Sequence, residues 1–113
     1  MPEAMSSDPH GRVYLHLSIR SSQQKRNLLM DFLAEAIPFY ESTGDLKVRL
    51  LQDTSDSDAF IEIIEYDSVE GFERDNKRTE SDPEMQQYLS RWRSLIDQLD
   101  VKVYRDNTSH VRK

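Results

Sequence analysis

Apolar and polar residues alternate without a break from Arg12 to Arg20, in the stretch "RVYLHLSIR". Side chains of a β-strand point to opposite faces in turn, so a period of two predicts a strand with one apolar face. The apolar face carries Val13, Leu15, Leu17 and Ile19, and the other face carries Tyr14, His16 and Ser18. The folded part of the chain is therefore expected to begin with a strand that is buried on one side.

The spacing of apolar residues changes to that of a helix after "SSQQ". Ser21 and Gln24 have the spacing of a capping box, which satisfies free backbone N–H groups at the start of a helix. The apolar stripe that follows comprises Leu28, Leu29, Phe32, Leu33, Ala36 and Ile37. We therefore expect a helix over residues 22–36 that is ended or kinked by Pro38.

Two further strands are expected to form a hairpin. The alternating run "LKVRLL" and the stretch "FIEIIEYDS", Phe60 to Ser68, are separated by the polar run "QDTSDSD". Two such runs joined by a polar loop predict an antiparallel pair. A loop tip centred near residues 55 and 56 places Arg49 directly opposite Glu62.

Helical signals return after the hairpin. A capping-box spacing starts a short helix at Asp67 that runs through Phe72, and a second start signal follows in "SDPE". Apolar residues then recur at helical spacing from Met85 to Leu99, with Trp92 as a core anchor. The run "VKVYR" is expected to be the last strand.

The order β-α-β-β-α-β predicts an α+β, ferredoxin-like fold, with a four-stranded antiparallel sheet and two helices on one face. A chain of 113 residues suits one domain. We expect a disordered tail over residues 1–11, the domain over residues 12–105 and a C-terminal tail over residues 106–113.

Two helices can cover only one face of this sheet. The face that suits them carries Val13, Leu15, Leu17, Val48, Leu50, Ile61, Ile63, Val101 and Val103. The opposite face is expected to carry Tyr14, His16, Ser18, Lys47, Arg49, Leu51, Phe60, Glu62, Ile64, Tyr66, Lys102 and Tyr104. Because this second face is too apolar for solvent and too polar for a core, it predicts an interface or a ligand site.

Composition excludes several classes of function. A net charge of −6 disfavours binding to nucleic acid or to an anionic membrane, which needs clustered Lys and Arg. The absence of cysteine excludes disulfides and Cys-ligated metals. His10, His16 and His110 are scattered, and no glycine-rich phosphate loop exists, so we expect no metal and no cofactor. With neither a signal peptide nor a membrane span in the sequence, we expect a cytoplasmic protein.

An RNA-binding sheet is one alternative for the second face. The RNA-recognition motif has the same topology and stacks bases on sheet aromatics, and "VYLHLS" resembles its first signature. Its other signature needs a basic residue and a glycine where this chain has Asp56, Ser57 and Asp58. Because Glu62 would also face the phosphates, RNA binding is disfavoured.

The run "IEYDSVEGF", Ile64 to Phe72, resembles the Glu-x-aromatic-x-Ser-x-x-x-Phe segment of the dimeric α/β-barrel superfamily. That superfamily includes the antibiotic-biosynthesis-monooxygenase-like and NIPSNAP-like proteins. "SDPEMQQYL" is similar to a helix start common in those groups, and the resemblance covers roughly residues 12–105. It implies a homodimer in which two sheets face each other around a ligand or reaction pocket.

The predicted pocket between the sheets is lined by Tyr14, His16, Arg49, Phe60, Glu62, Ile64, Tyr66 and Tyr104. His16 is the candidate general base, and Glu62 is the carboxylate that would tune it. Alternatively, His16 is a hydrogen-bonded residue of a wet interface, and Glu62 pairs with Arg49 across the strands. Glu65 is expected to be structural.

Two functions remain open, and a third is disfavoured. The favoured one is a homodimer that binds a small, partly apolar or aromatic molecule, or stabilises a partner, without catalysis. The alternative is a cofactor-independent monooxygenase-like enzyme acting on an aromatic or polyketide-like substrate. Haem degradation, which some members of the superfamily perform, is disfavoured. Those members use an Asn on the first strand, where this chain offers only His16 and Ser18, and a Trp that is missing near Asp75.

Overall fold

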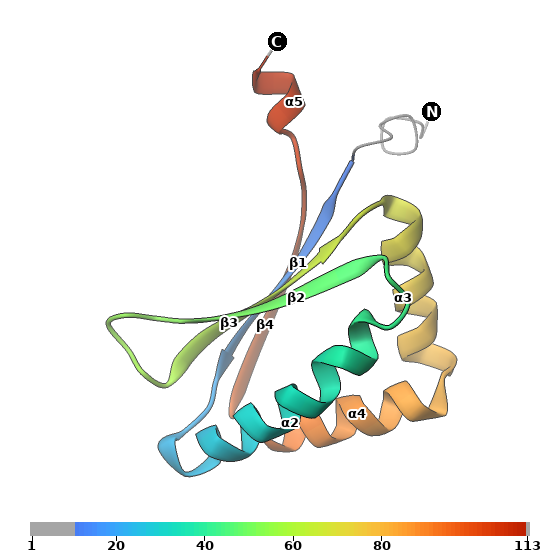
Figure 1. The fold of residues 1–113 in the computed structure, drawn as a ribbon. Helices are drawn as coiled ribbons and strands as arrows, with labels where there is room; N and C mark the ends of the chain where they lie inside the picture. The colour runs from blue at the N-terminus through green and yellow to red at the C-terminus, as the bar shows by residue number, and fades with distance from the viewer. Residues whose placement is uncertain (1–10, 113) are drawn as a thin grey trace.

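Three helices cover one face of a four-stranded sheet in the computed structural model, which describes residues 11–112 (Figure 1). The elements are β1 (Val13–Arg20), α2 (Gln23–Glu41), β2 (Leu46–Gln52), β3 (Ala59–Tyr66), α3 (Val69–Ser81), α4 (Pro83–Ser94), β4 (Gln98–Arg105) and α5 (Thr108–Val111). The sheet is antiparallel with the order β2-β3-β1-β4. The predicted ferredoxin-like class is confirmed. Residues 1–10 of the predicted N-terminal tail lie outside the described part of the chain.

The first helix is longer than predicted, because α2 continues through Pro38 to Glu41. A proline inside a helix costs about 3 kcal/mol, since it removes one backbone hydrogen bond. Packing of the following turn offsets this cost. Tyr40 is buried, and the ring of Phe39 stacks on that of Tyr88 with centroids 4.5 Å apart.

The two helices predicted after the hairpin are present, but the first does not end at Phe72, because α3 continues to Ser81. The polar stretch after Phe72 belongs to α3, which begins at a cap made by Ser68. The Ser68 hydroxyl accepts a hydrogen bond from the backbone N–H of Gly71 at 3.0 Å. The polar residues remain helical because one face of α3 packs on the sheet, through contacts such as that between Phe72 and Tyr66.

Asp82 ends α3 and caps α4, where Pro83 takes the first position. The helix stops at Ser94, so the predicted helical stripe extended too far. Leu99 lies instead on β4, directly opposite Ile19 of β1. Strand pairing with β1 therefore replaces the last helical turn that the apolar spacing predicted.

The core lies between helices α2 and α4 and the inner face of the sheet, the face that the helices cover. Its buried apolar residues are Val13, Leu17, Ile19, Leu29, Phe32, Leu33, Ala36, Tyr40, Leu46, Phe60, Ile64, Tyr66, Met85 and Trp92. Full burial of one large apolar side chain stabilises a fold by about 1.5–3 kcal/mol. The prediction that Trp92 is a core anchor is confirmed, because 5% of it is exposed.

The register of β3 differs by one residue from the prediction. Arg49 lies opposite Ile63, and Glu62 lies between Leu50 of β2 and Leu17 of β1. The inner face therefore carries Phe60, Glu62, Ile64 and Tyr66, and the open face carries Ile61 and Ile63. The face assignment of all six residues was wrong.

The cause of this error lies in the β2–β3 loop. Both faces of β3 are largely apolar, so the side-chain pattern specifies its register weakly. The loop is fixed instead by ion pairs from Arg20 to Asp56, at 2.7 Å, and from Arg26 to Asp58. These contacts centre the turn on Asp56, half a residue beyond the symmetric position assumed from the sequence.

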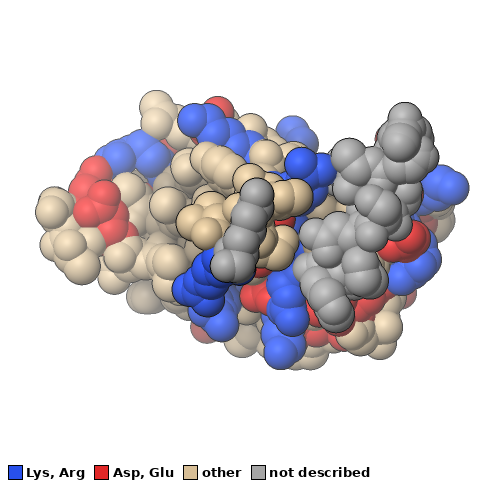
Figure 2. Space-filling model, turned by 90° about the horizontal axis from the view of Figure 1, so that it is seen from above, with Lys and Arg blue, Asp and Glu red and all other residues tan. Residues whose placement is uncertain are grey.

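The open face of the sheet is a grid of three rows that cross β2, β3, β1 and β4 in that order. The rows are Lys47, Glu65, Tyr14, Tyr104; Arg49, Ile63, His16, Lys102; and Leu51, Ile61, Ser18, Asp100. Glu65 accepts a hydrogen bond from Arg12 at the edge of this face. Figure 2 views the molecule from above relative to Figure 1, and on this side Lys and Arg groups lie beside Asp and Glu groups, with neutral surface between these charged clusters.

Candidate functional site

A cavity of about 420 Å³ lies between the inner face of the sheet and helices α3 and α4. Its walls are mainly apolar, with Leu15, Leu17 and Ile64 from the sheet and Met85 and Leu89 from α4. The polar or aromatic residues of the lining are Tyr40, Glu62, Tyr66, Phe72, Asp75, Asn76, Thr79, Trp92 and Arg93. Ligand sites in proteins have this composition and begin at about 300 Å³.

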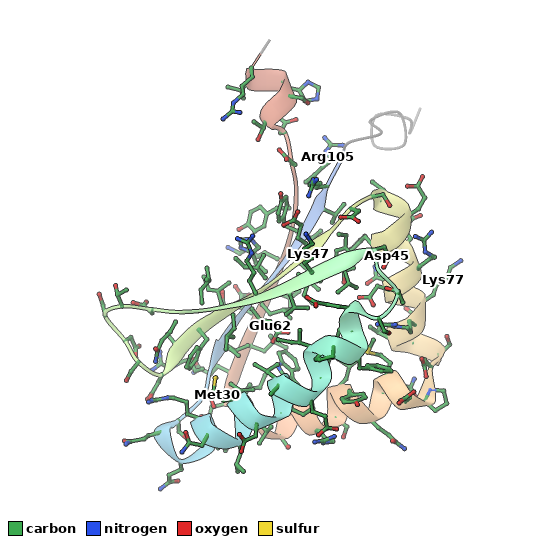
Figure 3. All side chains as sticks on the ribbon, viewed as in Figure 1. Met30, Asp45, Lys47, Glu62, Lys77 and Arg105 are labelled. Carbon is green, nitrogen blue, oxygen red and sulfur yellow. The ribbon has the colours of Figure 1, made fainter. Side chains whose placement is uncertain are left out.

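Glu62 is the buried acid of this cavity. It projects from the middle of β3 into the space between the sheet and the helices (Figure 3), and 2% of it is exposed. The indole Nε1–H of Trp92 donates a hydrogen bond to its Oε1 at 3.1 Å. No hydrogen bond reaches Oε2 from the described residues, so this oxygen is available to a ligand.

Burial raises the pKa of Glu62 from 4.5 to about 7, and the hydrogen bond from Trp92 opposes this rise. Removing a carboxylate from water disfavours its charged form, and no cation compensates here. The carboxyl group therefore changes charge near neutral pH. Perturbed acids in a cleft are typical of functional sites.

A second polar group lies at the α3 end of the cavity. The Tyr66 hydroxyl donates a hydrogen bond to Asp75, and Arg78 pairs with the same carboxylate at 3.5 Å. Burial raises the pKa of Tyr66, and the bond to Asp75 adds to this shift. Arg78 also donates to the backbone carbonyl of Tyr40 at 3.2 Å, so this network holds α2, α3 and β3 together.

The cavity opens along β4. The inner face of this edge strand extends beyond the helices, and Val101 and Val103 are 49% and 54% exposed. Asn76 of α3 and Arg93 of α4 are the exposed polar residues of the lining. A molecule entering here would pass apolar side chains before it meets Glu62.

No protein-family model matches the chain, and no curated protein sequence matches it significantly. Solved structures do match. A putative antibiotic biosynthesis monooxygenase from Chloroflexus aurantiacus is 26% identical, with a TM-score of 0.57 over 84% of this chain and 90% of the other. SnoaB, a cofactor-independent oxygenase from Streptomyces nogalater, is 11% identical, with a TM-score of 0.70 over 85% and 93%. A NIPSNAP family protein of unknown function from Agrobacterium tumefaciens is 19% identical, with a TM-score of 0.67 over 86% and 89%.

The chain has the dimeric α/β-barrel superfamily fold. The resemblance read from "IEYDSVEGF" and "SDPEMQQYL" is thus confirmed at the level of fold. Function does not follow from this fold alone, because one fold carries many sites. The site of this protein has to be derived from its own residues.

The predicted site residues fall on both sides of the sheet. Glu62, Ile64 and Tyr66 line the cavity, and Phe60 is buried on the same face. Tyr14, His16, Arg49 and Tyr104 lie on the open face, where the rings of His16 and Tyr104 are 4.7 Å apart. Neither a His16–Glu62 nor an Arg49–Glu62 pair is possible through the sheet, so both predicted pairings were wrong.

The sequence-based set missed three residues of the cavity that bear on its chemistry, namely Trp92, Asp75 and Tyr40. Trp92 was recognised only as a core residue, although an indole N–H on a buried helix face needs an acceptor. That rule points to a buried acid or carbonyl opposite α4. Asp75 had no such signal, since it lies in a polar stretch that was not predicted to be helical.

A second, larger hollow of about 760 Å³ lies at the hairpin end of the sheet. Its charged residues, Arg20, Asp53 and Asp100, are partly or fully exposed, so it lacks the buried acid that distinguishes the first cavity. Within residues 11–112, no group of three or more His, Asp or Glu side chains is placed to hold a metal ion. None of the helices in that range has the length and hydropathy needed to cross a bilayer.

Proposed function

We propose that this dimeric α/β-barrel protein binds a small, partly apolar or aromatic molecule in the cavity between the sheet and the helices. The observation that carries the proposal is Glu62, which is 2% exposed and faces an apolar cavity with one neutral hydrogen-bond donor. Burying an acid without a cation destabilises a fold by several kcal/mol, so a purely structural role does not explain it. A ligand whose polar group reaches Glu62 does.

Access through the β4 side is tested by blocking it. Val101→Trp puts a large side chain at the exposed mouth and leaves the core intact. We expect it to weaken binding of the neutral fluorescent probe N-phenyl-1-naphthylamine by at least about tenfold, equivalent to 1.4 kcal/mol. The measurement is a fluorescence titration of the probe.

The matched control is Val111→Trp, because Val111 is 80% exposed on α5, away from the cavity lining. It should bind the probe like the unmodified protein. If the Val101→Trp and Val111→Trp variants bound the probe with equal affinity, the probe would not bind in this cavity.

A second candidate function is cofactor-independent oxygenation, the activity by which SnoaB is described. The observation that favours it is a pKa of about 7 for Glu62, which suits a general base at neutral pH. The Glu62 carboxylate would take a proton from an activated CH₂ group, and the carbanion would add to O₂. The resulting peroxide takes that proton back, and loss of water leaves a carbonyl, so that R₂CH₂ and O₂ give R₂C=O and H₂O.

We further propose that the open face packs against a second copy of the chain. Leu51, Ile61 and Tyr104 are 50%, 37% and 47% exposed on this face, and exposed apolar patches of this kind are typical of interfaces. The arrangement would also bury His16 at the interface. It gives the homodimer a contact surface separate from the ligand cavity.

Ile61→Lys tests the dimer, since it places a charge among the apolar residues of the open face. We expect sedimentation at micromolar concentration to give twice the chain mass of 13.3 kDa for the unmodified protein and 13.3 kDa for the variant. Leu28→Lys is the control, because Leu28 is 57% exposed on α2, on the other side of the sheet. A monomeric unmodified protein would refute the dimer.

A further inference from the structure

Glu62 is an acid without a counter-ion. Its Oε1 accepts a hydrogen bond from a neutral donor, Trp92 Nε1, and none of the ion pairs among the described residues includes it. Neither Arg78 nor Arg93 pairs with Glu62. Arg78 pairs with Asp75, and Arg93 is exposed at the mouth of the cavity. One positive charge at the inner end of the cavity would therefore balance Glu62, and none of the described residues supplies it there.

The walls around this place suit a cation. Tyr40, Tyr66, Phe72 and Trp92 all line the cavity, and the face of an aromatic ring attracts a cation by about 0.5–2 kcal/mol. The rest of the lining is aliphatic and suits the hydrocarbon part of a ligand. An anionic ligand at the inner end is disfavoured, because it would meet the unpaired carboxylate of Glu62 there, whereas Arg93 is exposed at the mouth.

We infer that the cavity selects an organic ammonium ion with an apolar or aromatic body, for which Glu62 is the counter-ion and the surrounding rings are the cage. This inference rests on the proposed function, since it specifies the chemical class of the molecule bound there. The ammonium group donates hydrogen bonds to Glu62 Oε2, and its body occupies the space toward β4. The charge that the fold buries without compensation is then paired in the complex.

Binding of a cation is coupled to the ionisation of Glu62. The other titratable or charged groups that line the cavity are Tyr40 of α2, Tyr66 of β3, Asp75 of α3 and Arg93 of α4. None of the tyrosines loses a proton near neutral pH, because burial raises the pKa of both. Glu62 must be charged to pair with the ligand, so affinity should fall as pH decreases below 7.

The test uses four compounds of one shape: 2-naphthylmethylamine, 2-naphthylmethanol, 2-naphthol and 2-naphthoate. Calorimetric titration at pH 8 is expected to show the ammonium compound binding at least about tenfold more tightly than the alcohol, with the carboxylate weakest. Lowering the pH to 6 should weaken the ammonium compound by about tenfold and leave the alcohol unchanged. Glu62→Gln should remove the preference for ammonium and keep binding of the alcohol.

The exposed Glu73 of α3 provides the matched control, since Glu73→Gln removes the same charge from the surface. It should keep the full preference. A carboxylate or alcohol that binds as tightly as the ammonium compound overturns the inference, and so does a preference that survives in Glu62→Gln. Tightest binding of 2-naphthol, whose keto tautomer carries an activated CH₂ group at C1, with uptake of dissolved oxygen, overturns it in favour of the general-base function. Binding of none of the four compounds refutes the proposed function itself.

Discussion

Glu62→Gln is expected to stabilise the protein by about 2–3 kcal/mol more at pH 8 than at pH 5. Glutamine keeps the shape of the side chain and can accept the hydrogen bond from Trp92, but it has no charge to bury. The pKa of Glu62 is 4.5 unfolded and about 7 folded, a difference that corresponds to about 3 kcal/mol at 1.36 kcal/mol per unit. The measurement is urea unfolding of both proteins across this pH range.

The direction of this effect follows from proton binding. Between pH 4.5 and 7 the folded protein holds a proton on Glu62 that the unfolded chain has lost, so raising the pH favours unfolding. The stability that the neutral carboxyl contributes is fully present below pH 4.5 and is lost as the pH rises through 7. The glutamine variant has no such loss.

Comparison of two pH values cancels the effects of glutamine that do not depend on pH. Glu73→Gln serves as the control, because Glu73 is exposed on α3 and should show no such difference between pH 5 and pH 8. A constant free-energy difference between Glu62→Gln and the unmodified protein from pH 5 to pH 8 would show that Glu62 ionises normally, and the buried-acid interpretation would fail.

Trp92→Ala is expected to destabilise the protein by about 3–5 kcal/mol at every pH, because it leaves a large void in the core. Trp92→Phe keeps most of the packing and removes only the Nε1–H donor. We expect it to cost about 1–3 kcal/mol at pH 8, where the bond serves a charged acceptor, and less at pH 5. Urea unfolding at the two pH values measures both variants.

The two variants also differ in their effect on Glu62. Because the hydrogen bond from Trp92 lowers the pKa of Glu62, losing it in Trp92→Phe should raise that pKa further above 7. Carboxyl ¹³C shifts report this value directly. A purely structural tryptophan would leave the pKa of Glu62 unchanged in Trp92→Phe, and that result would contradict the positioning role. Trp92 is the single tryptophan of the chain, so its own fluorescence should report ionisation of Glu62 in the unmodified protein.

The fold was predictable from the sequence where periodicity is unambiguous. β1 alternates between apolar and polar positions, and α2 has a clean apolar stripe, so both were located, although α2 continues past its predicted end to Glu41. The position of β3 in the sequence was predicted equally well, but which of its two faces points toward the helices was not. With isoleucines on one face and Phe60, Ile64 and Tyr66 on the other, no periodic signal distinguishes inside from outside.

This single ambiguity also determined how much of the site was predictable. Glu62 was recognised as the acid most relevant to function, because an ionisable residue interrupts an apolar strand. Its partners were assigned from the wrong face, which gave His16 and Arg49 in place of Trp92 and Tyr40. The missing information lies in tertiary contacts of the β2–β3 loop, and no local pattern contains it.

The two apolar faces of β3 have a consequence for how the chain folds. A hairpin shifted by one residue would still bury isoleucines against the helices, so it competes with the native pairing during refolding at little hydrophobic cost. The native and shifted registers differ in their polar contacts. Only the native register brings Glu62 to Trp92 and the Tyr66 hydroxyl to Asp75. These two hydrogen bonds, rather than burial of the acid itself, thus favour the native strand alignment.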